Sequence, residues 1–169
     1  MSKKIILLAG PTASGKSKLA IEIANKIDGE IINADSMQVY RDFSILSSRP
    51  LKKDLKKIKH HLYGFISSKK HFSTGAWLSL AKEKIKLCLS KKKIPILVGG
   101  TGLYFEAITK GMSKIPNIDF KKRNIIRDLQ VKLGQKEFYK KLLKLDPLVN
   151  NRIEPFDMQR SIRAYEVKK

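Results

Sequence analysis

The stretch Gly10-Pro11-Thr12-Ala13-Ser14-Gly15-Lys16-Ser17 follows the apolar run at residues 5–9 and precedes a largely apolar run at residues 19–24. It fits the phosphate-loop pattern G-x-x-x-x-G-K-[ST] in the setting that this pattern requires, between a buried strand and a helix. Two glycines let the backbone curl so that consecutive N–H groups point inward, and the following helix adds its positive N-terminal end. The sequence therefore predicts a phosphate-binding loop in an α/β domain.

Two side chains of this loop have predicted roles. Lys16 would reach the terminal phosphates as a point charge, and the Ser17 hydroxyl would ligate a magnesium ion that bridges them. The alternative is a glycine turn with a solvated lysine, but all four fixed positions of the pattern are present. The loop does not reveal whether the phosphates are cleaved, transferred or expelled. The predicted phosphate ligands are Gly10, Pro11, Thr12, Ala13, Ser14, Gly15, Lys16 and Ser17, with Ser17 also the Mg²⁺ ligand.

Composition limits the class of protein. The chain has 169 residues, 42% of them apolar, which allows one folded core and one small additional module. Its 36 Lys and Arg against 15 Asp and Glu give a net charge of +21, which favours a polyanionic partner such as nucleic acid over a surface that is merely lysine-rich. The single cysteine, Cys88, excludes intramolecular disulfides and multi-cysteine zinc sites. We expect a cytoplasmic protein that does not enter a membrane, because no apolar stretch approaches the length of a membrane span.

Two further predicted strands end in polar or glycine-rich segments. Residues 30–34 form a short apolar strand that ends at Asp35, and residues 95–98 form another that ends at Gly99-Gly100-Thr101. Because ligands bind beyond the carboxyl ends of parallel strands, Asp35 and Thr101 should lie beside the phosphate loop. Two structural alternatives remain open: Asp35 with Gln38 would form a capping box that starts a helix, and Thr101 would be an N-cap.

The remaining chain reads as mainly helical. A helix is predicted from Thr74 or Gly75 to about Ser90, with an apolar face at Trp77, Leu80, Ala81, Ile85 and Leu89. The adjacent pair His60-His61 makes a poor joint metal site, since neighbouring side chains point apart, so packing or substrate contact is favoured. Beyond residue 119 the runs are helical, and Arg123 with Arg127 and Arg160 with Arg163 each lie about one turn apart. We place the domain boundary between residues 116 and 117.

Four motifs occur in order: GPTASGKS at 10–17, DSMQVY at 35–40, VGGTGLY at 98–104, and DMQR with RAYE across 157–166. Together they resemble the tRNA dimethylallyltransferase, or tRNA isopentenyltransferase, family over residues 4–168. The resemblance implies a three-layer α/β fold of the P-loop NTPase type with a helical insertion domain that is only partly present. It also implies transfer of a dimethylallyl group from its diphosphate, with Mg²⁺, to the exocyclic N6 amine of the adenosine 3′-adjacent to the anticodon of tRNA.

The resemblance carries roles onto matching residues. Asp35 would be the general base that accepts the amine proton, and Thr101 would lie near the target nucleotide. We expect tRNA and dimethylallyl diphosphate as partners, no membrane partner, and a monomer. The residues expected to contact tRNA are Asp35, Ser36, Met37, Gln38, Thr101, Arg123, Gln159, Arg160, Ser161, Ile162 and Arg163.

The chain departs from the family pattern in two ways. Where many members have Gly-Thr-Ala-Lys-Pro, residues 46–50 read Leu-Ser-Ser-Arg-Pro, which keeps a hydroxyl and a cation but replaces the glycine. Family members are also much longer, so this chain resembles an N-terminal portion whose sheet lacks strands and exposes an edge. Two other functions remain alternatives. The first is a small-molecule or nucleotide kinase, and the second is an RNA-binding fragment without chemistry.

Overall fold

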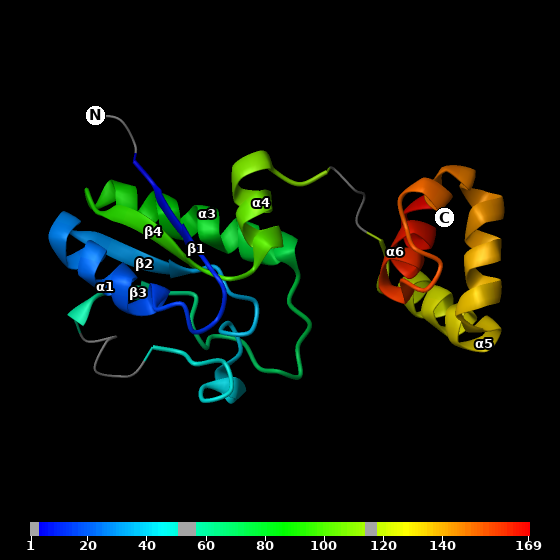
Figure 1. Ribbon diagram of the computed structural model, residues 1–169, viewed down its shortest axis with the longest axis horizontal. Coiled ribbons are helices and arrows are strands. Elements are labelled where there is room, and N and C mark those ends of the chain that lie inside the picture. The colour runs from blue at the N-terminus through cyan, green and yellow to red at the C-terminus, as the bar shows by residue number, and fades with distance from the viewer. Residues whose placement is uncertain (1–3, 51–56, 114–117) are drawn as a thin grey trace. The chain divides into compact units, whose positions relative to one another are not determined.

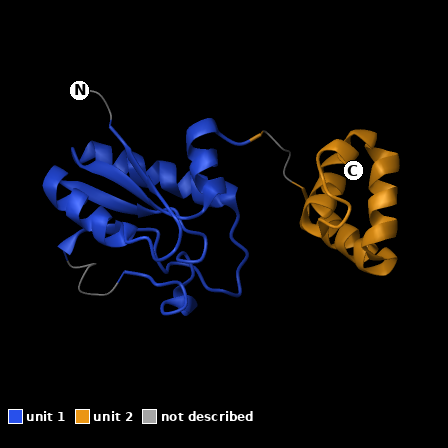
Figure 2. Ribbon diagram, viewed as in Figure 1, with its two compact units in different colours: residues 1–112 blue, residues 113–169 orange. Residues whose placement is uncertain are grey.

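The computed structural model describes residues 4–50, 57–113 and 118–169. The chain divides into two compact units, residues 1–112 and 113–169, shown in different colours in Figure 2. The boundary that the sequence placed between residues 116 and 117 lies within segment 114–117, which is outside the described residues. Each unit is described by itself.

Unit 1 is built on a parallel sheet with the strand order β1-β4-β2-β3 (Figure 1). All neighbouring strands run parallel, as strands joined by helical crossovers should. The α/β prediction is therefore confirmed. The elements are β1 (Ile6–Ala9), α1 (Lys16–Ile27), β2 (Gly29–Asn33), the 3₁₀ turn η1 (Arg41–Phe43), β3 (His60–His61), α3 (Thr74–Ser90), β4 (Ile94–Gly99) and α4 (Gly102–Lys110).

Helices cover both faces of this sheet, which gives three layers. Ile31 and Ile96 pack against α1, whereas their chain neighbours Ile32 and Leu97 pack against α3 and α4 on the opposite face. This alternation follows from the two-residue period of a strand. The sheet strands read as nearly continuous apolar runs because both faces are buried.

β1 lies at the edge of the sheet formed by the described residues and pairs only with β4. Its residues Ile6 and Leu8 pack toward α1, but Leu7 is 42% exposed. A strand that starts a phosphate loop therefore has one open edge, as the sequence predicted.

Unit 2 is helical, as the sequence predicted. It contains α5 (Phe120–Leu145), the 3₁₀ turn η2 (Pro147–Asn151) and α6 (Met158–Lys168). Within α5, Gly134 has φ 71° and ψ 164°, so this element is two helices joined at a kink. Phe138 and Tyr165 pack ring against ring at 5.1 Å in the core of the unit.

Two local predictions require correction. The short strand β3 was not predicted, because two histidines carry no strand pattern; its pairing with β2 comes from the tertiary fold. The alternative that Asp35 and Gln38 form a capping box and start a helix is wrong, since residues 36–39 form turns. The helix at 74–90 is confirmed, but its fully covered face holds Leu78 and Cys88, whereas Leu80 and Leu89 are only partly buried.

Candidate phosphate-binding and acceptor site

The phosphate loop owes its shape to two residues in the left-handed region of the backbone. Gly15 has φ 78°, and Ala13 has φ 64°, which a residue with a Cβ rarely adopts. The Lys16 ammonium folds back over the loop and donates to the Pro11 carbonyl at 2.5 Å. The Lys16 side chain is therefore folded back against the loop that precedes it.

The N-terminus of α1 has no side chain that caps its first N–H groups. Gly15 occupies the N-cap position and supplies no capping side chain, and the first turn contains no acidic residue. The first N–H groups of a helix need partners and carry the positive end of the helix dipole. The loop and helix start therefore offer donors suited to an anion, and phosphate binding there stays a prediction.

Close backbone approach joins the end of β4 to the segment that carries Asp35. A Cβ at Gly99 would lie 2.1 Å from the carbonyl carbon and oxygen of Ala34, so only glycine fits there. A Cβ at Gly100 would lie 3.1 Å from the Gly10 carbonyl oxygen and 3.9 Å from Oδ2 of Asp35. These two glycines let the phosphate loop, β4 and the Asp35 segment converge at one edge of the sheet.

Asn33 fixes the backbone around Asp35. Its Oδ1 accepts the Asp35 N–H at 2.9 Å, and its Nδ2 donates to the carbonyls of Asp35 and Leu62 at 2.9 and 3.0 Å. Asn33 is fully buried, and its own carbonyl accepts the indole N–H of Trp77 at 2.8 Å. The sequence analysis missed this positioning role, although an Asn at the end of an apolar strand is a detectable signal.

Only one oxygen of the Asp35 carboxylate accepts a hydrogen bond from the described residues. Its Oδ1 accepts the Met37 N–H at 2.9 Å, which forms a turn, while Oδ2 accepts no hydrogen bond from the described residues. Thr101 lies beside this turn: its hydroxyl accepts the Ser36 N–H at 2.9 Å and donates to the Ser36 hydroxyl at 3.3 Å. Thr101 is at the N-cap position of α4, but its side chain caps no helical N–H.

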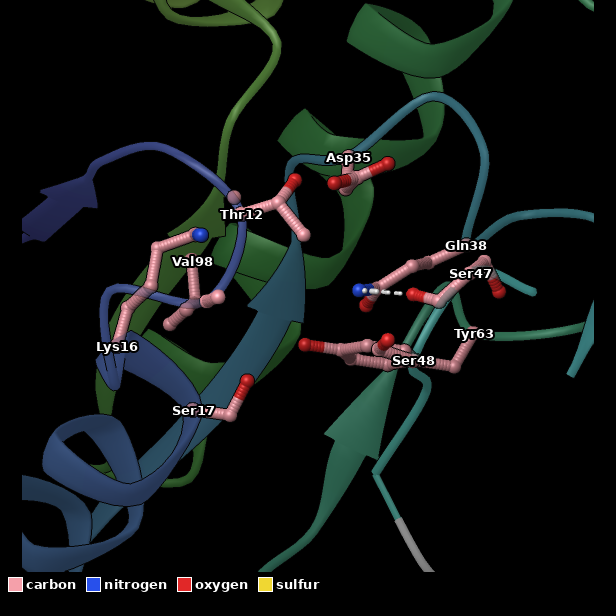
Figure 3. Close-up of a pocket in the computed structure, with 11 residues that line it drawn as sticks. Thr12, Lys16, Ser17, Asp35, Gln38, Ser47, Ser48, Tyr63 and Val98 are labelled. Atoms are coloured by element: carbon pink, nitrogen blue, oxygen red, sulfur yellow. Dashed lines mark hydrogen bonds between the residues drawn. The ribbon is translucent and has the colours of Figure 1, made fainter. Parts of the chain in front are cut away.

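One pocket brings most of these groups together (Figure 3). Thr12, Ala13, Lys16 and Ser17 of the phosphate loop and α1 share its lining with Asp35 and Gln38. Lys16 and Ser17 lie on one side in Figure 3, and Gln38 lies on the other with Asp35 above. The predicted phosphate site and the predicted carboxylate are therefore neighbours in one hollow.

The opposite wall includes residues that the sequence analysis did not assign. Ser47, Ser48 and Tyr63 complete it. Gln38 donates its side-chain N–H to the Ser47 carbonyl at 2.9 Å, which ties the segment after Asp35 to the loop at residues 44–49. Ser47 and Ser48 belong to the stretch 46–50 that departs from the family pattern, whereas no motif marks Tyr63.

The departure from the family pattern at residues 46–50 has a structural outcome. Leu46 is 85% exposed, so the replaced glycine is tolerated at a solvent-facing position. The Arg49 guanidinium donates to the Arg41 carbonyl at 3.2 Å and lies where any side chain at Gly64 would stand. The retained cation holds this loop together and is not in the lining of the pocket.

In unit 2, two of the predicted tRNA-contacting arginines meet one buried acid. Arg163 donates to Oε2 of Glu166 at 2.9 Å, and Nε of Arg123 lies 4.0 Å from the same oxygen. The Glu166 side chain is 5% exposed, while those of Arg123 and Arg163 are 34% and 43% exposed. Both guanidinium groups therefore neutralise Glu166 and keep a solvent-facing part.

The segment 159–163 combines surface and interior. Gln159 is exposed, and Arg160 is exposed and pairs with Asp157 at 3.0 Å. Ser161 is fully buried, and its hydroxyl donates to the Asp157 carbonyl at 2.7 Å and accepts from Gln135 at 3.2 Å. Ile162 packs against the core of the unit.

The two adjacent histidines face different surroundings, as the sequence predicted. Buried His61 lies 2.6 Å from the Glu30 carboxylate, and the Cys88 thiol donates to the same carboxylate oxygen at 3.5 Å. Burial raises the pKa of Glu30, but the hydrogen bonds from His61 and Cys88 outweigh it and hold that pKa below its ordinary value. Burial and Glu30 raise the pKa of Cys88 to about 12, so the thiol stays protonated.

These three donors could in principle surround a metal ion. However, two ligands of a tetrahedral zinc ion stand about 3.4 Å apart, given metal–ligand distances of about 2.1 Å. The 2.6 Å contact between His61 and Glu30 is instead a direct, charge-assisted hydrogen bond. We therefore interpret this cluster as a packing element between β2, β3 and α3. His60 contacts Tyr63 edge to face.

None of the helices within residues 4–50, 57–113 and 118–169 has the length and apolar character needed to cross a bilayer.

Comparison with known proteins identifies the family. The family model described as IPP transferase matches residues 38–169. The chain is 61% identical to a tRNA dimethylallyltransferase of Pelagibacter ubique (strain HTCC1062) over 165 residues, which are 98% of this chain and 53% of that protein. It is 49% identical to a tRNA dimethylallyltransferase of Rickettsia massiliae (strain Mtu5), with 98% of this chain and 46% of that protein covered. The chain spans about half the length of the curated relatives it matches.

Solved structures agree with the sequence relatives. A eukaryotic dimethylallyltransferase acting on tRNA superposes with a TM-score of 0.79 at 30% identity, covering 99% of this chain and 43% of that one. The full-length tRNA isopentenylpyrophosphate transferase from Bacillus halodurans superposes with a TM-score of 0.65 at 32% identity, covering 98% and 55%. The motifs, the parallel sheet and these matches lead to one conclusion: the chain belongs to the IPP transferase family.

Proposed function

We propose that this chain transfers a dimethylallyl group from dimethylallyl diphosphate to the N6 amine of the adenosine 3′-adjacent to the anticodon in tRNA, and releases diphosphate. The observation that carries this proposal is the position of Asp35 in the wall of the pocket that Lys16 and Ser17 also line. A phosphate-binding loop and a half-free carboxylate in one hollow suit a reaction that expels an anion and removes a proton.

The phosphate loop would hold the diphosphate. Lys16 and the open N–H groups at the start of α1 face the charge that grows on the leaving oxygens when the bond to the prenyl carbon breaks. The electron pair of that bond leaves with the diphosphate, and the adenosine nitrogen forms the new bond to carbon. The site would therefore stabilise the leaving group more strongly as the reaction proceeds.

Magnesium fits the donor set of this pocket. The Ser17 hydroxyl is a hard oxygen ligand placed beside the phosphate site, as this ion prefers. Bound magnesium would supply positive charge that lowers the barrier to diphosphate departure.

Asp35 would accept the proton that the amine loses. The lone pair of an exocyclic adenine amine is delocalised into the ring, so removal of its proton during bond formation assists attack. Oδ1 is anchored by the Met37 N–H, which leaves Oδ2 for this task. Thr101 holds the Ser36 segment in place beside it and would lie near the same nucleotide.

Contacts to tRNA would come from both units. In unit 1 they are the segment 35–38 and Thr101; in unit 2 they are Arg123 and the segment 159–163. The net charge of +21 supports binding to a polyanion, and the adenosine must leave its stack to reach a carboxylate within a pocket. A monomer in the cytoplasm is part of the same proposal.

Labelled dimethylallyl diphosphate, magnesium and unmodified tRNA test the reaction directly. We expect label in tRNA that has adenosine next to the anticodon, and none in the same tRNA with guanosine there. Retained tRNA binding without incorporation would contradict the transfer reaction and favour an RNA-binding fragment. Consumption of ATP with a small acceptor, without use of the prenyl diphosphate, would favour a kinase.

A further inference from the structure

Tyr63 stands in the wall of the pocket that faces the phosphate loop. It lies two residues after the end of β3 and lines the same hollow as Lys16 and Ser17. Figure 3 shows its hydroxyl end pointing across the pocket toward the side where Ser17 lies. The motifs assign it no role.

The ring of Tyr63 is held from behind. It packs against the apolar cluster between α1 and the sheet, and it meets His60 edge to face with 5.5 Å between the ring centres. A side chain that is fixed by packing presents its polar end at a defined place, which is what a preorganised ligand requires. The hydroxyl itself has no hydrogen-bond partner among the described residues.

Other polar groups in this wall are already engaged or less constrained. Gln38 gives its side-chain N–H to the Ser47 carbonyl, and the Ser47 hydroxyl donates to the Phe43 carbonyl at 2.5 Å. Ser48 is exposed to solvent. Asp35 is an acceptor that would repel an anion. Tyr63 is therefore an anchored hydrogen-bond donor of this wall, beside the second side-chain N–H of Gln38.

The phenol stays a donor at neutral pH. Burial, and to a smaller extent the Asp35 carboxylate, raise the pKa of Tyr63 above its ordinary value. A neutral hydroxyl beside Asp35 adds no negative charge to a pocket that must receive phosphate. Its proton remains available for an incoming oxygen.

We propose that the Tyr63 hydroxyl is a ligand of the diphosphate, which it binds from the wall opposite Lys16 and Ser17. This inference rests on the proposed function, since it assumes that the pocket takes a diphosphate. The anion would then be held between the loop on one side and a neutral donor on the other. The hydrogen bond would strengthen as the departing diphosphate gains charge.

Binding of inorganic pyrophosphate with magnesium, measured by calorimetry, tests this assignment. We expect Tyr63→Phe to weaken binding about tenfold, the loss typical of a hydrogen bond to a charged group. Tyr104→Phe is the matched control. Burial, with smaller contributions from Tyr40 and Asp35, also raises the pKa of Tyr104, but this ring is stacked on Trp77 and does not line the pocket. It should bind pyrophosphate like the wild type.

Further variants separate this inference from the proposed function. If Lys16→Ala abolishes pyrophosphate binding while Tyr63→Phe equals the wild type, the role of Tyr63 is overturned and the phosphate site stands. If the wild type binds no pyrophosphate, both proposals are overturned. Tyr63→Phe should keep the thermal midpoint of the free protein and its affinity for tRNA. Loss of tRNA affinity with normal pyrophosphate binding would assign Tyr63 to the nucleic acid and overturn the inference.

Discussion

The carboxyl edge of the sheet in unit 1 and the arginine cluster around Glu166 in unit 2 both gather polar side chains, but they leave them in opposite states. At the sheet edge, backbone contacts fix the side chains, and Oδ2 of Asp35 stays unbound within the protein. Around Glu166, the side chains hold each other, since Arg123 and Arg163 both turn to one carboxylate. The carboxylate oxygen with a proposed role is therefore kept free where the backbone does the positioning. Charged groups on helices are partly used for stability.

The largest effect is expected where the backbone does the positioning. Gly99→Ala should lower the free energy of unfolding of unit 1 by more than about 3 kcal/mol, because the new Cβ would lie 2.1 Å from the Ala34 backbone. Gly102→Ala is the control: its Cβ meets nothing within 4 Å, so we expect a change within about 1 kcal/mol. Denaturant unfolding of both variants measures the difference. Equal, small effects would show that the close approach at residue 99 is not needed.

The next effect concerns chemistry rather than folding. Asp35→Asn should lower turnover about a hundredfold or more, the usual loss for a general base, while tRNA binding stays within a few-fold. The amide oxygen can still accept the Met37 N–H, so the turn at residues 35–37 should survive. Asp35→Ala removes that bond as well. If both variants lost tRNA binding and turnover to the same extent, Asp35 would be a structural turn residue. The sheet edge and the cluster around Glu166 would then both use their charged side chains for stability.

How far the sequence predicts each region follows from the same contrast. The phosphate loop and Asp35 were predictable because a motif, a strand end and the common edge of parallel strands are all local or topological signals. The opposite wall of the pocket, which includes Tyr63, was not predictable from local patterns. Its loop is held by pairings such as the Gly64 N–H with the Gln38 carbonyl at 2.9 Å and the Arg41 N–H with the Ile66 carbonyl at 2.8 Å. These bonds join residues that are far apart in the chain and leave no periodic pattern in the sequence.

In unit 2 the helices were predictable, but the use of their polar residues was not. Helical periodicity places Arg160 and Arg163 about one turn apart, yet it does not reveal that one pairs with Asp157 and the other with buried Glu166. Ser161 illustrates the same limit: a small polar residue between two arginines reads as surface, but it is buried by the packing of α6 on α5. Tertiary packing decided these positions.

The buried pair of Glu30 and His61 tests whether unit 1 also contains charges used purely for stability. Because the folded pKa of Glu30 is lowered, its charge stabilises the fold above the ordinary pKa of 4.5, and this contribution is lost as pH falls through the folded pKa. Glu30→Gln should therefore lower stability at pH 7 by about 2 kcal/mol and remove that part of the acid dependence. Chemical unfolding between about pH 2 and pH 7 measures the loss of stability and its dependence on acid.

Glu137→Gln is the comparison variant for this measurement. Hydrogen bonding and the charge of Lys140 lower the pKa of Glu137 as well, but the pair is exposed to solvent. Its effect should disappear at high salt, whereas that of buried Glu30 should persist. An acid dependence of Glu30→Gln equal to that of the wild type would mean that the pair does not stabilise the fold through charge.

The smallest effect on stability, and the sharpest test of unit 2, belongs to Arg160. Its pair with Asp157 is exposed, so Arg160→Ala should change the free energy of unfolding by less than about 0.5 kcal/mol. Arg163→Ala should cost more, because among the described residues it leaves buried Glu166 with Arg123 as its remaining cationic partner. A change in tRNA binding by Arg160→Ala is therefore free of a folding contribution. If Arg160 contacts a phosphate, the slope of log affinity against log salt should fall by about one. An unchanged slope would show that Arg160 does not contact a phosphate.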